Sequence, residues 1–92
     1  MILSFSCEHT RALFAGETVA RFANLAVVAQ RKLAMLHRAV QLDDLRIPPN
    51  NRLEALKGNR KKQFSIRIND QWRICFRFDG GHAYEVEIVD YH

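Results

Sequence analysis

Hydrophobic positions follow two different periods in the two halves of the chain. Between residues 19 and 40 they recur at spacings of three and four, the pattern of a helix with one buried face. Its apolar stripe comprises Phe22, Leu25 or Ala26, Ala29, Leu33, Leu36 and Val40, with Arg21, Asn24, Arg31, Lys32 and Arg38 on other faces. A shorter helix is expected over residues 8–15, ended by Gly16, and a short strand over residues 2–5.

In the second half the period changes to two. The alternating runs and the turns between them are residues 64–68, Asn69-Asp70-Gln71, residues 72–78, Asp79-Gly80-Gly81 and residues 84–89. This pattern predicts three antiparallel strands in a meander. The proline pair Pro48-Pro49 ends the helical half, because proline cannot continue a helix. Helices that precede a sheet predict one α+β domain over residues 1–92.

The alternation also sorts the strand side chains between two faces. The helix is expected to cover an apolar face that carries Phe64, Ile66, Ile68, Trp72, Ile74, Phe76, Phe78, Tyr84, Val86 and Ile88. The opposite, open face carries Arg67, Arg73 and Arg77 with Glu85 and Glu87, and the same parity adds Tyr91. Cross-strand ion pairs of little energetic value are the alternative to a functional role for Arg67 and Arg77.

Basic side chains are concentrated in the middle of the chain. Residues 46–77 carry nine basic and two acidic side chains, whereas residues 78–92 carry four acidic and no basic ones. A cluster of this kind is typical of a surface that binds a polyanion such as RNA, although a solvated surface has the same composition.

Other features of the composition narrow the class of protein. Residues 1–5 do not resemble a signal peptide, and charged residues interrupt the apolar segment over residues 19–40, so we expect a cytoplasmic protein without a membrane span. Cys7 and Cys75 are too far apart in sequence for a zinc motif and lie among apolar residues. We therefore expect two buried thiols, no metal site and no disulfide.

The sequence ends in Asp90-Tyr91-His92, an acid, a phenol and an imidazole. Histidine is the side chain best matched to proton transfer near neutral pH. A terminal tripeptide alone is a weak signal, because chain ends are usually frayed. The other histidines, His9, His37 and His82, are expected to be surface or packing residues.

Longer stretches carry a more specific signal. They are Ile2–Cys7, Gln30–Leu36, Arg52–Arg60, Phe64–Phe76 and Val86–His92. In this order, over essentially the full chain, they resemble the HigB toxins of the RelE/ParE superfamily. The resemblance implies a microbial-RNase-like fold, with helices on one face of a twisted antiparallel sheet. It also implies a toxin, monomeric by itself, that needs no cofactor and cleaves mRNA in the A site of the small ribosomal subunit. The implied partner is a HigA-like helix-turn-helix antitoxin, in a hetero-oligomer.

RNA cleavage of this kind uses the 2′-hydroxyl of the substrate as nucleophile. It needs a base, an acid for the leaving oxygen, and cations around the phosphorane. We expect His92 to transfer protons and Tyr91 to orient or stack on the substrate. Asp90 either positions His92 or caps the last strand. Arg73 and Lys57 are expected to hold the scissile phosphate.

Glu54 departs from the family pattern, because some members carry a histidine there. It is either the second acid/base residue or a salt-bridge partner of Arg52 or Lys57. The remaining cations are assigned to phosphate contacts on ribosomal RNA or mRNA, which position without reading sequence. They are Arg60, Lys61, Lys62, Arg67 and Arg77.

Two other functions stay open at this point. A ParE-like inhibitor of DNA gyrase shares the fold but has no catalytic role for His92. A non-catalytic RNA-binding module would use the basic cluster alone. Mapping of mRNA ends after incubation with translating ribosomes separates the nuclease from both.

Overall fold

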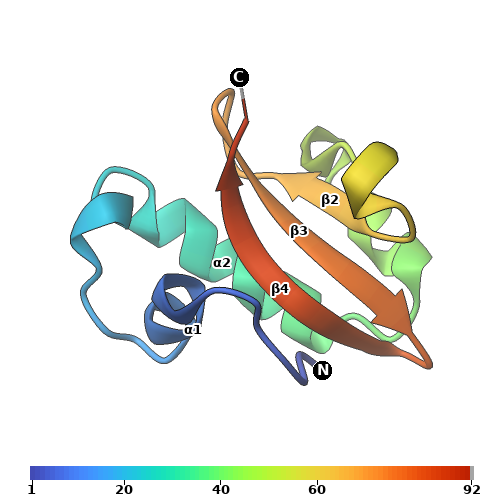
Figure 1. Cartoon of the computed structure of the whole chain (residues 1–92), viewed down its shortest axis with the longest axis horizontal. Coiled ribbons are helices and arrows are strands. Elements are labelled where there is room, and N and C mark those ends of the chain that lie inside the picture. The colour runs from blue at the N-terminus through green and yellow to red at the C-terminus, as the bar shows by residue number, and fades with distance from the viewer. Residues whose placement is uncertain (92) are drawn as a thin grey trace.

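In the computed structural model, which describes residues 1–91, two α-helices cover one face of an antiparallel sheet (Figure 1). The elements are α1 (Glu8–Phe14), α2 (Ala26–Arg38), β1 (Glu54–Ala55), β2 (Phe64–Arg67), β3 (Trp72–Asp79) and β4 (His82–Asp90). Short 3-10 turns lie at Ala20–Phe22, Leu42–Arg46, Pro49–Asn51 and Gly58–Arg60. The strands are neighbours in chain order, so the predicted α+β fold and the β2–β4 meander are confirmed. No helix within the described range is long and apolar enough to cross a membrane.

The first helix ends at the residue that the sequence indicates. Gly16 has φ 93°, and its N–H donates to the carbonyl of Leu13 at 3.0 Å, which closes the last turn. The hydroxyl of Thr10, fully buried, accepts the backbone N–H of Ile88 at 3.0 Å. This hydrogen bond fastens α1 to β4 and so helps to cover the apolar face of the sheet.

The expected long helix, with its apolar stripe from Phe22 to Val40, is shorter than predicted at both ends. A 3-10 turn precedes α2, and Val40 is 71% exposed instead of continuing the buried stripe. The chain turns away because Ala39 adopts an extended conformation, with ψ 132°. The Asp44 carboxylate then accepts the backbone N–H groups of Val40 and Gln41 at 2.9 and 3.0 Å. A pattern of apolar residues cannot reveal such a capping interaction.

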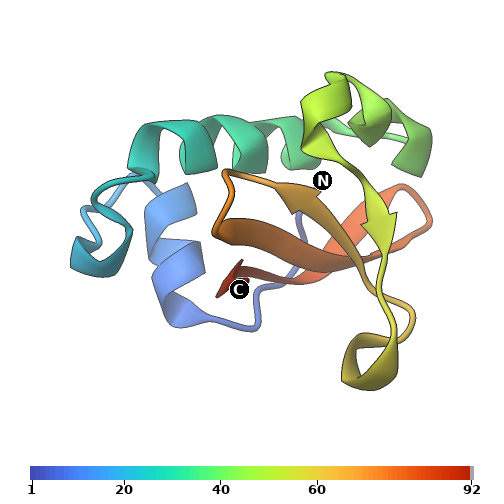
Figure 2. The ribbon, with the colours of Figure 1, turned by 90° about the horizontal axis from the view of Figure 1, so that it is seen from above.

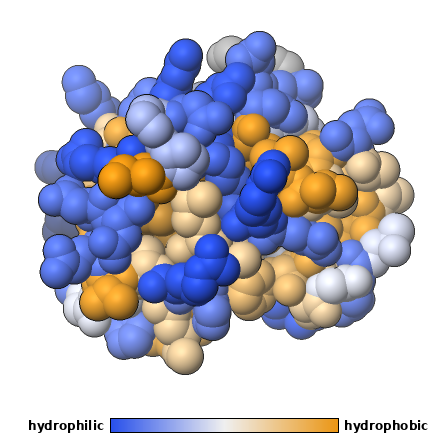
Figure 3. Space-filling view, turned by 180° about the vertical axis from the view of Figure 1, so that it is seen from behind, coloured by the Kyte–Doolittle hydropathy of each residue, from blue (hydrophilic) through white to orange (hydrophobic). Residues whose placement is uncertain are grey.

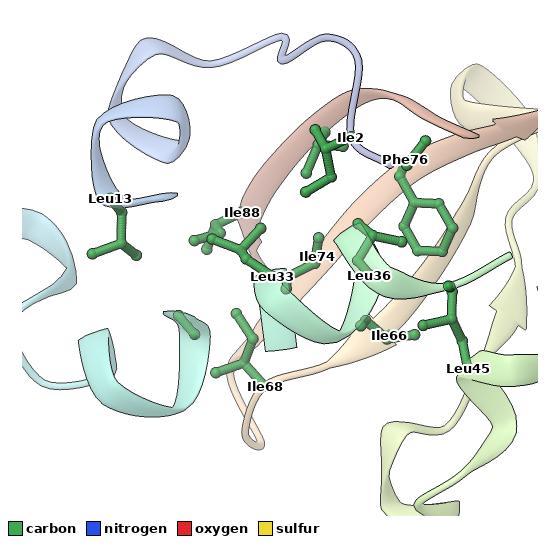
Figure 4. Packing of buried hydrophobic residues seen from close by; sticks show 14 of the residues in the cluster. Ile2, Leu13, Leu33, Leu36, Leu45, Ile66, Ile68, Ile74, Phe76 and Ile88 are labelled. Atoms are coloured by element: carbon green, nitrogen blue, oxygen red, sulfur yellow. The ribbon is translucent and has the colours of Figure 1, made fainter. Parts of the chain in front are cut away.

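The core lies between α2 and the covered face of the sheet. Ala29, Leu33 and Leu36 are fully buried, as the helical stripe predicts. Figure 4 shows Leu33 and Leu36 of α2 directed toward Ile74 and Ile66 of the central strands. Each fully buried aliphatic side chain contributes roughly 1.5–3 kcal/mol through removal of apolar surface from water. This layer holds the opposite face of β2 and β3 in a fixed position.

An irregularity in β4 changes the face of one predicted core residue. Cys75 is opposite Glu87, whereas Arg77 is opposite Tyr84, so β4 contains an extra residue at this point. Glu85 takes up the difference with φ 55°, a conformation characteristic of a β-bulge. Tyr84, expected on the apolar face, therefore lies on the open face, and that prediction was wrong.

Two short segments extend the sheet at its edges. Ile2 and Phe5 form parallel bridges to Ala83 and Val86, in place of the continuous strand expected over residues 2–5. At the other edge, β1 was not predicted, and it places Glu54 opposite Ser65 of β2. Figure 2 shows α2 on one side of the sheet and the connection between β1 and β2 projecting on the other.

Candidate nucleic-acid site on the open face

Arg73 lies on the open face of β3 but is only 9% exposed. Its Nε donates to the hydroxyl of Ser65 at 2.8 Å, and its Nη2 donates to the carbonyl of Arg52 at 2.7 Å. These acceptors are neutral, so they fix the guanidinium plane without cancelling its charge. A cation that is held in this way is suited to bind a phosphate, because it loses little freedom on binding.

Glu54 is the acidic neighbour of this guanidinium. One oxygen of its carboxylate lies 3.9 Å from Nη2 of Arg73, at the limit of an ion pair, and the side chain is 56% exposed. Among residues 1–91, the ion pair of Glu54 is therefore with Arg73, and not with Arg52 or Lys57, the two partners considered from the sequence. β1 creates this proximity, because it brings residue 54 alongside β2. A carboxylate beside this cation is close enough to take part in proton transfer or to compete with a bound phosphate.

Tyr91 lies over the same arginine, on the face that the alternation predicts. Its ring centroid is 5.9 Å from the guanidinium carbon of Arg73, and its backbone N–H donates to the carbonyl of Gln71. The residue is 38% exposed, so part of the ring is available to a ligand. A cation beneath an exposed aromatic ring is a combination that binds a nucleotide by its phosphate and its base.

Asp90 and His92 are the other two residues of the C-terminal tripeptide that the sequence assigns to the site. Asp90 accepts a hydrogen bond from Nε2 of Gln71 at 3.1 Å. In the β3–β4 register it is opposite Trp72, so Asp90 and Tyr91 leave the strand on different sides. His92, the predicted proton-transfer residue, lies outside the described residues.

Lys57 lies in the connection between β1 and β2, and its side chain is exposed. The carbonyl of Lys57 accepts the N–H of Arg60 at 3.4 Å, which starts the 3-10 turn. Within residues 1–91, no ion pair or hydrogen bond joins the Lys57 side chain to the group around Arg73. Its part in phosphate binding stays a prediction.

Three of the five cations assigned to phosphate contacts already have acidic partners. Arg60 pairs with Glu87 at 2.9 Å, and Arg77 lies 3.5 Å from Glu85 and stacks on Tyr84. The third, Arg67, pairs with the fully exposed Asp70. The hydrogen bond from Arg67 lowers the pKa of the Asp70 carboxyl.

Lys61 and Lys62 are different from these three arginines. Both are exposed, and neither makes an ion pair in the part of the chain that the structure describes. Lys61 and Lys62 can therefore bind a phosphate directly, whereas each of the three arginines must first break its ion pair with a carboxylate.

Ser65 is the residue that sequence reasoning missed. Its side chain is fully buried, and its hydroxyl orients Arg73. The sequence did show that Ser65, two residues before Arg67, lies on the open face of the strand. It could not show that Arg73 is its partner, because the pairing of β2 with β3 was unknown. Cys75, opposite Ser65, is fully buried as expected, and burial raises the pKa of its thiol. The other thiol, Cys7, is only partly buried, contrary to expectation.

Solved structures with the same architecture define the class of fold. The whole chain superposes on 98% of a chain in each of two structures of the YoeB–YefM complex from Staphylococcus aureus. The TM-scores are 0.61 and 0.63, with 17% sequence identity in both cases. The chain therefore shares its fold, helices on one face of a four-stranded antiparallel sheet, with a chain of this toxin–antitoxin complex.

Sequence comparison identifies the family within this class. Residues 13–92 match the family described as the RelE-like toxin of the type II toxin–antitoxin system HigB, and the chain belongs to this family. It is 51% identical to Toxin HigB-1 of Vibrio cholerae over 53 residues, which are 58% of this chain and 56% of the relative. It is 44% identical to Endoribonuclease HigB of Proteus vulgaris over 41 residues, 45% of each chain. The matched segments thus span about half the length of these curated relatives.

Proposed function

We propose that this chain is the toxin of a type II toxin–antitoxin pair and acts as a ribosome-dependent endoribonuclease. Its target would be mRNA in the A site of the small ribosomal subunit, and its effect the inhibition of translation. The observation that supports this most directly is the buried guanidinium of Arg73, held by neutral acceptors beneath the ring of Tyr91. Membership of the HigB family and the endoribonuclease name of the Proteus relative agree with it.

The proposed reaction is an internal transesterification. The 2′-hydroxyl attacks the adjacent phosphorus, the bond to the 5′-oxygen breaks, and a 2′,3′-cyclic phosphate remains. One proton leaves the 2′-hydroxyl and one is delivered to the 5′-oxygen. His92 delivers the second proton, and Glu54, whose carboxylate lies 3.9 Å from Arg73, accepts the first.

Arg73 stabilises the extra negative charge that develops on the phosphorane. Because Ser65 and Arg52 already orient its guanidinium, no reorganisation is needed as the charge develops. Lys57 supplies a second cation. Tyr91 stacks on a base, which tolerates different codons since every base has an aromatic face.

The five basic residues assigned to phosphate contacts would bind RNA at positions other than the scissile phosphate. Lys61 and Lys62 bind phosphates directly. Arg60, Arg67 and Arg77 contribute after exchange of their carboxylate partners for phosphates, so each adds less binding free energy than a free lysine.

The proposed partner is a HigA-like helix-turn-helix antitoxin encoded beside the toxin gene. The solved structures that share the fold are complexes of a toxin with an antitoxin, which supports a hetero-oligomer. The toxin acts in the cytoplasm, where translating ribosomes are found, and it needs neither a metal ion nor an organic cofactor for this reaction.

The test is incubation of the purified chain with translating ribosomes, followed by mapping of mRNA 5′ ends. Wild-type protein is expected to produce cuts within A-site codons. His92→Gln should slow cleavage about 10²–10⁴-fold, the usual contribution of a general acid or base. His9→Gln is the matched control, because His9 is exposed on α1.

Two results would contradict the proposal. Full activity of the His92→Gln protein removes the proton-transfer assignment. Intact mRNA together with stalled DNA gyrase favours instead a ParE-like, non-catalytic inhibitor built on the same fold.

A further inference from the structure

A groove of about 710 Å³ runs along the helical side of the molecule, away from the Arg73 site. It lies between α2 and the segment at residues 48–50, and we call it the α2 groove. Its lining includes Val28, Arg31, Lys32, Met35, Pro49 and Ile68. Figure 3 shows the side of the molecule that carries α2, where apolar patches lie among charged side chains.

The α2 groove contains a cation that the fold leaves without an acidic partner. Lys32 is only 6% exposed, and its ammonium group donates to the side-chain oxygen of Asn51. In the described part of the chain, no carboxylate pairs with Lys32 or with the neighbouring Arg31. Burial lowers the pKa of Lys32, and the charges of Arg31 and Arg67 lower it further. An anion in the groove would therefore gain electrostatic energy that nothing in the fold already supplies.

The apolar part of the groove indicates what carries this anion. Its walls are aliphatic side chains, proline and methionine, and none of its lining residues is aromatic. RNA bases are bound chiefly by stacking on aromatic or guanidinium planes. Aliphatic and methionine-lined grooves with cations at the side instead suit a peptide with apolar anchors and acidic flanks.

The position of the groove relative to the sheet limits which residues an occupant can cover. Ile68, which lines it, directly follows β2 and is buried like Ile66, whereas Ser65 and Arg67 lie on the open face. An occupant of the α2 groove therefore lies on the helical side and does not cover Arg73 directly.

We propose that the α2 groove binds an acidic segment of the cognate antitoxin, with aliphatic anchors against Val28 and Met35 and carboxylates at Lys32 and Arg31. This inference rests on the partnership with an antitoxin proposed above. The segment tethers the antitoxin to the helical side of the toxin and leaves Arg73 uncovered. Binding weakens with added salt, because part of it consists of ion pairs.

The experiment measures the dissociation constant of the full chain for the purified antitoxin encoded beside it, by titration calorimetry. Arg31→Glu and Val28→Asp place negative charge in the groove, and each should weaken binding by about tenfold or more. Arg38→Glu and Val27→Asp make the same changes at exposed α2 residues that do not line the groove. These controls should stay within about threefold of wild type, a difference typical of near-neutral surface positions.

The outcomes separate this inference from the proposed function, because mRNA cleavage is measured on the same variants. Undiminished antitoxin binding by Arg31→Glu and Val28→Asp overturns the inference, as does an equal loss in both controls. Loss of cleavage with unchanged antitoxin binding also overturns it and assigns the groove to RNA. Selective loss of antitoxin binding supports it, even where the wild-type chain fails to cut mRNA and the proposed function is wrong.

Discussion

Arg73 and Arg77 lie four residues apart on the same face of β3, roughly 13 Å from one another along an extended strand. Arg73 is 9% exposed and donates to the hydroxyl of Ser65 and the carbonyl of Arg52. The side chain of Arg77 is 39% exposed, stacks on Tyr84 and lies 3.5 Å from the Glu85 carboxylate. The sequence presents two equivalent cations, whereas the structure gives them different neighbours.

The difference between these arginines concerns how a cation is held. Neutral acceptors orient Arg73, and its ion pair with Glu54 is at the distance limit of 3.9 Å. Arg77 instead pairs with the Glu85 carboxylate at 3.5 Å, and both side chains are substantially exposed. Exposed pairs of the second kind contribute little to stability and must be broken before a phosphate can bind. This difference favours Arg73 over Arg77 as the phosphate-binding residue of the proposed reaction.

The largest expected effect is on cleavage. Arg73→Ala should lower the rate of A-site cleavage about 10²–10³-fold, the cost of losing one oriented donor to a developing oxyanion. Arg77→Ala should stay within about threefold of wild type, since its loss leaves an exposed carboxylate that water solvates. Rates come from single-turnover cleavage, with circular dichroism of both variants to verify folding. Equal losses of cleavage rate in the two variants would show that the two arginines do not differ in function.

A smaller effect is expected when the orientation of Arg73 is disturbed without removal of its charge. Ser65→Ala deletes the acceptor of Nε and should slow cleavage about tenfold, in line with about 1.5–3 kcal/mol for a hydrogen bond to a charged group. The loss should appear in kcat more than in KM, because it concerns the transition state. Ser65→Thr keeps the hydroxyl and should recover most of the rate. A wild-type rate for Ser65→Ala would mean that Arg52 alone is sufficient.

The smallest effect concerns Arg67, a third arginine on this face, which is ion-paired like Arg77. The pKa of Asp70 is lower in the folded state than in the unfolded chain because Arg67 donates to it. The pair therefore stabilises the fold above the unfolded pKa, and this stability is lost as the pH falls through the lowered value. Urea unfolding of Asp70→Asn should thus show a small deficit at neutral pH that disappears in acid. A deficit independent of pH would exclude the ion pair as its cause.

The outline of the fold and part of the site could be predicted from residue order. Alternation over residues 64–78 placed Arg73 on the open face, and the same parity placed Tyr91 there, because neighbouring strand residues point to opposite sides. The three-and-four spacing predicted the buried face of α2 through Leu33 and Leu36.

Predictions from residue order were wrong where a contact between residues distant in sequence determined the backbone conformation. Tyr84 changed face because the bulge at Glu85 shifts the register with β3, where Cys75 is opposite Glu87. The backbone of this bulge is held by Ser4, whose hydroxyl accepts the Glu85 N–H at 2.9 Å from the other end of the chain. No local pattern contains that interaction.

By itself, the sequence determined which faces are apolar, where the cations gather and which family the chain resembles, because these depend on spacing and composition. Only the tertiary structure decided which cation is available. Ser65 orients Arg73, Glu85 pairs with Arg77, and the buried Lys32 has no carboxylate partner within residues 1–91. The physical reason is that charge and hydrogen bonding act over a few ångströms in space, between residues that the chain separates by as many as 81 positions.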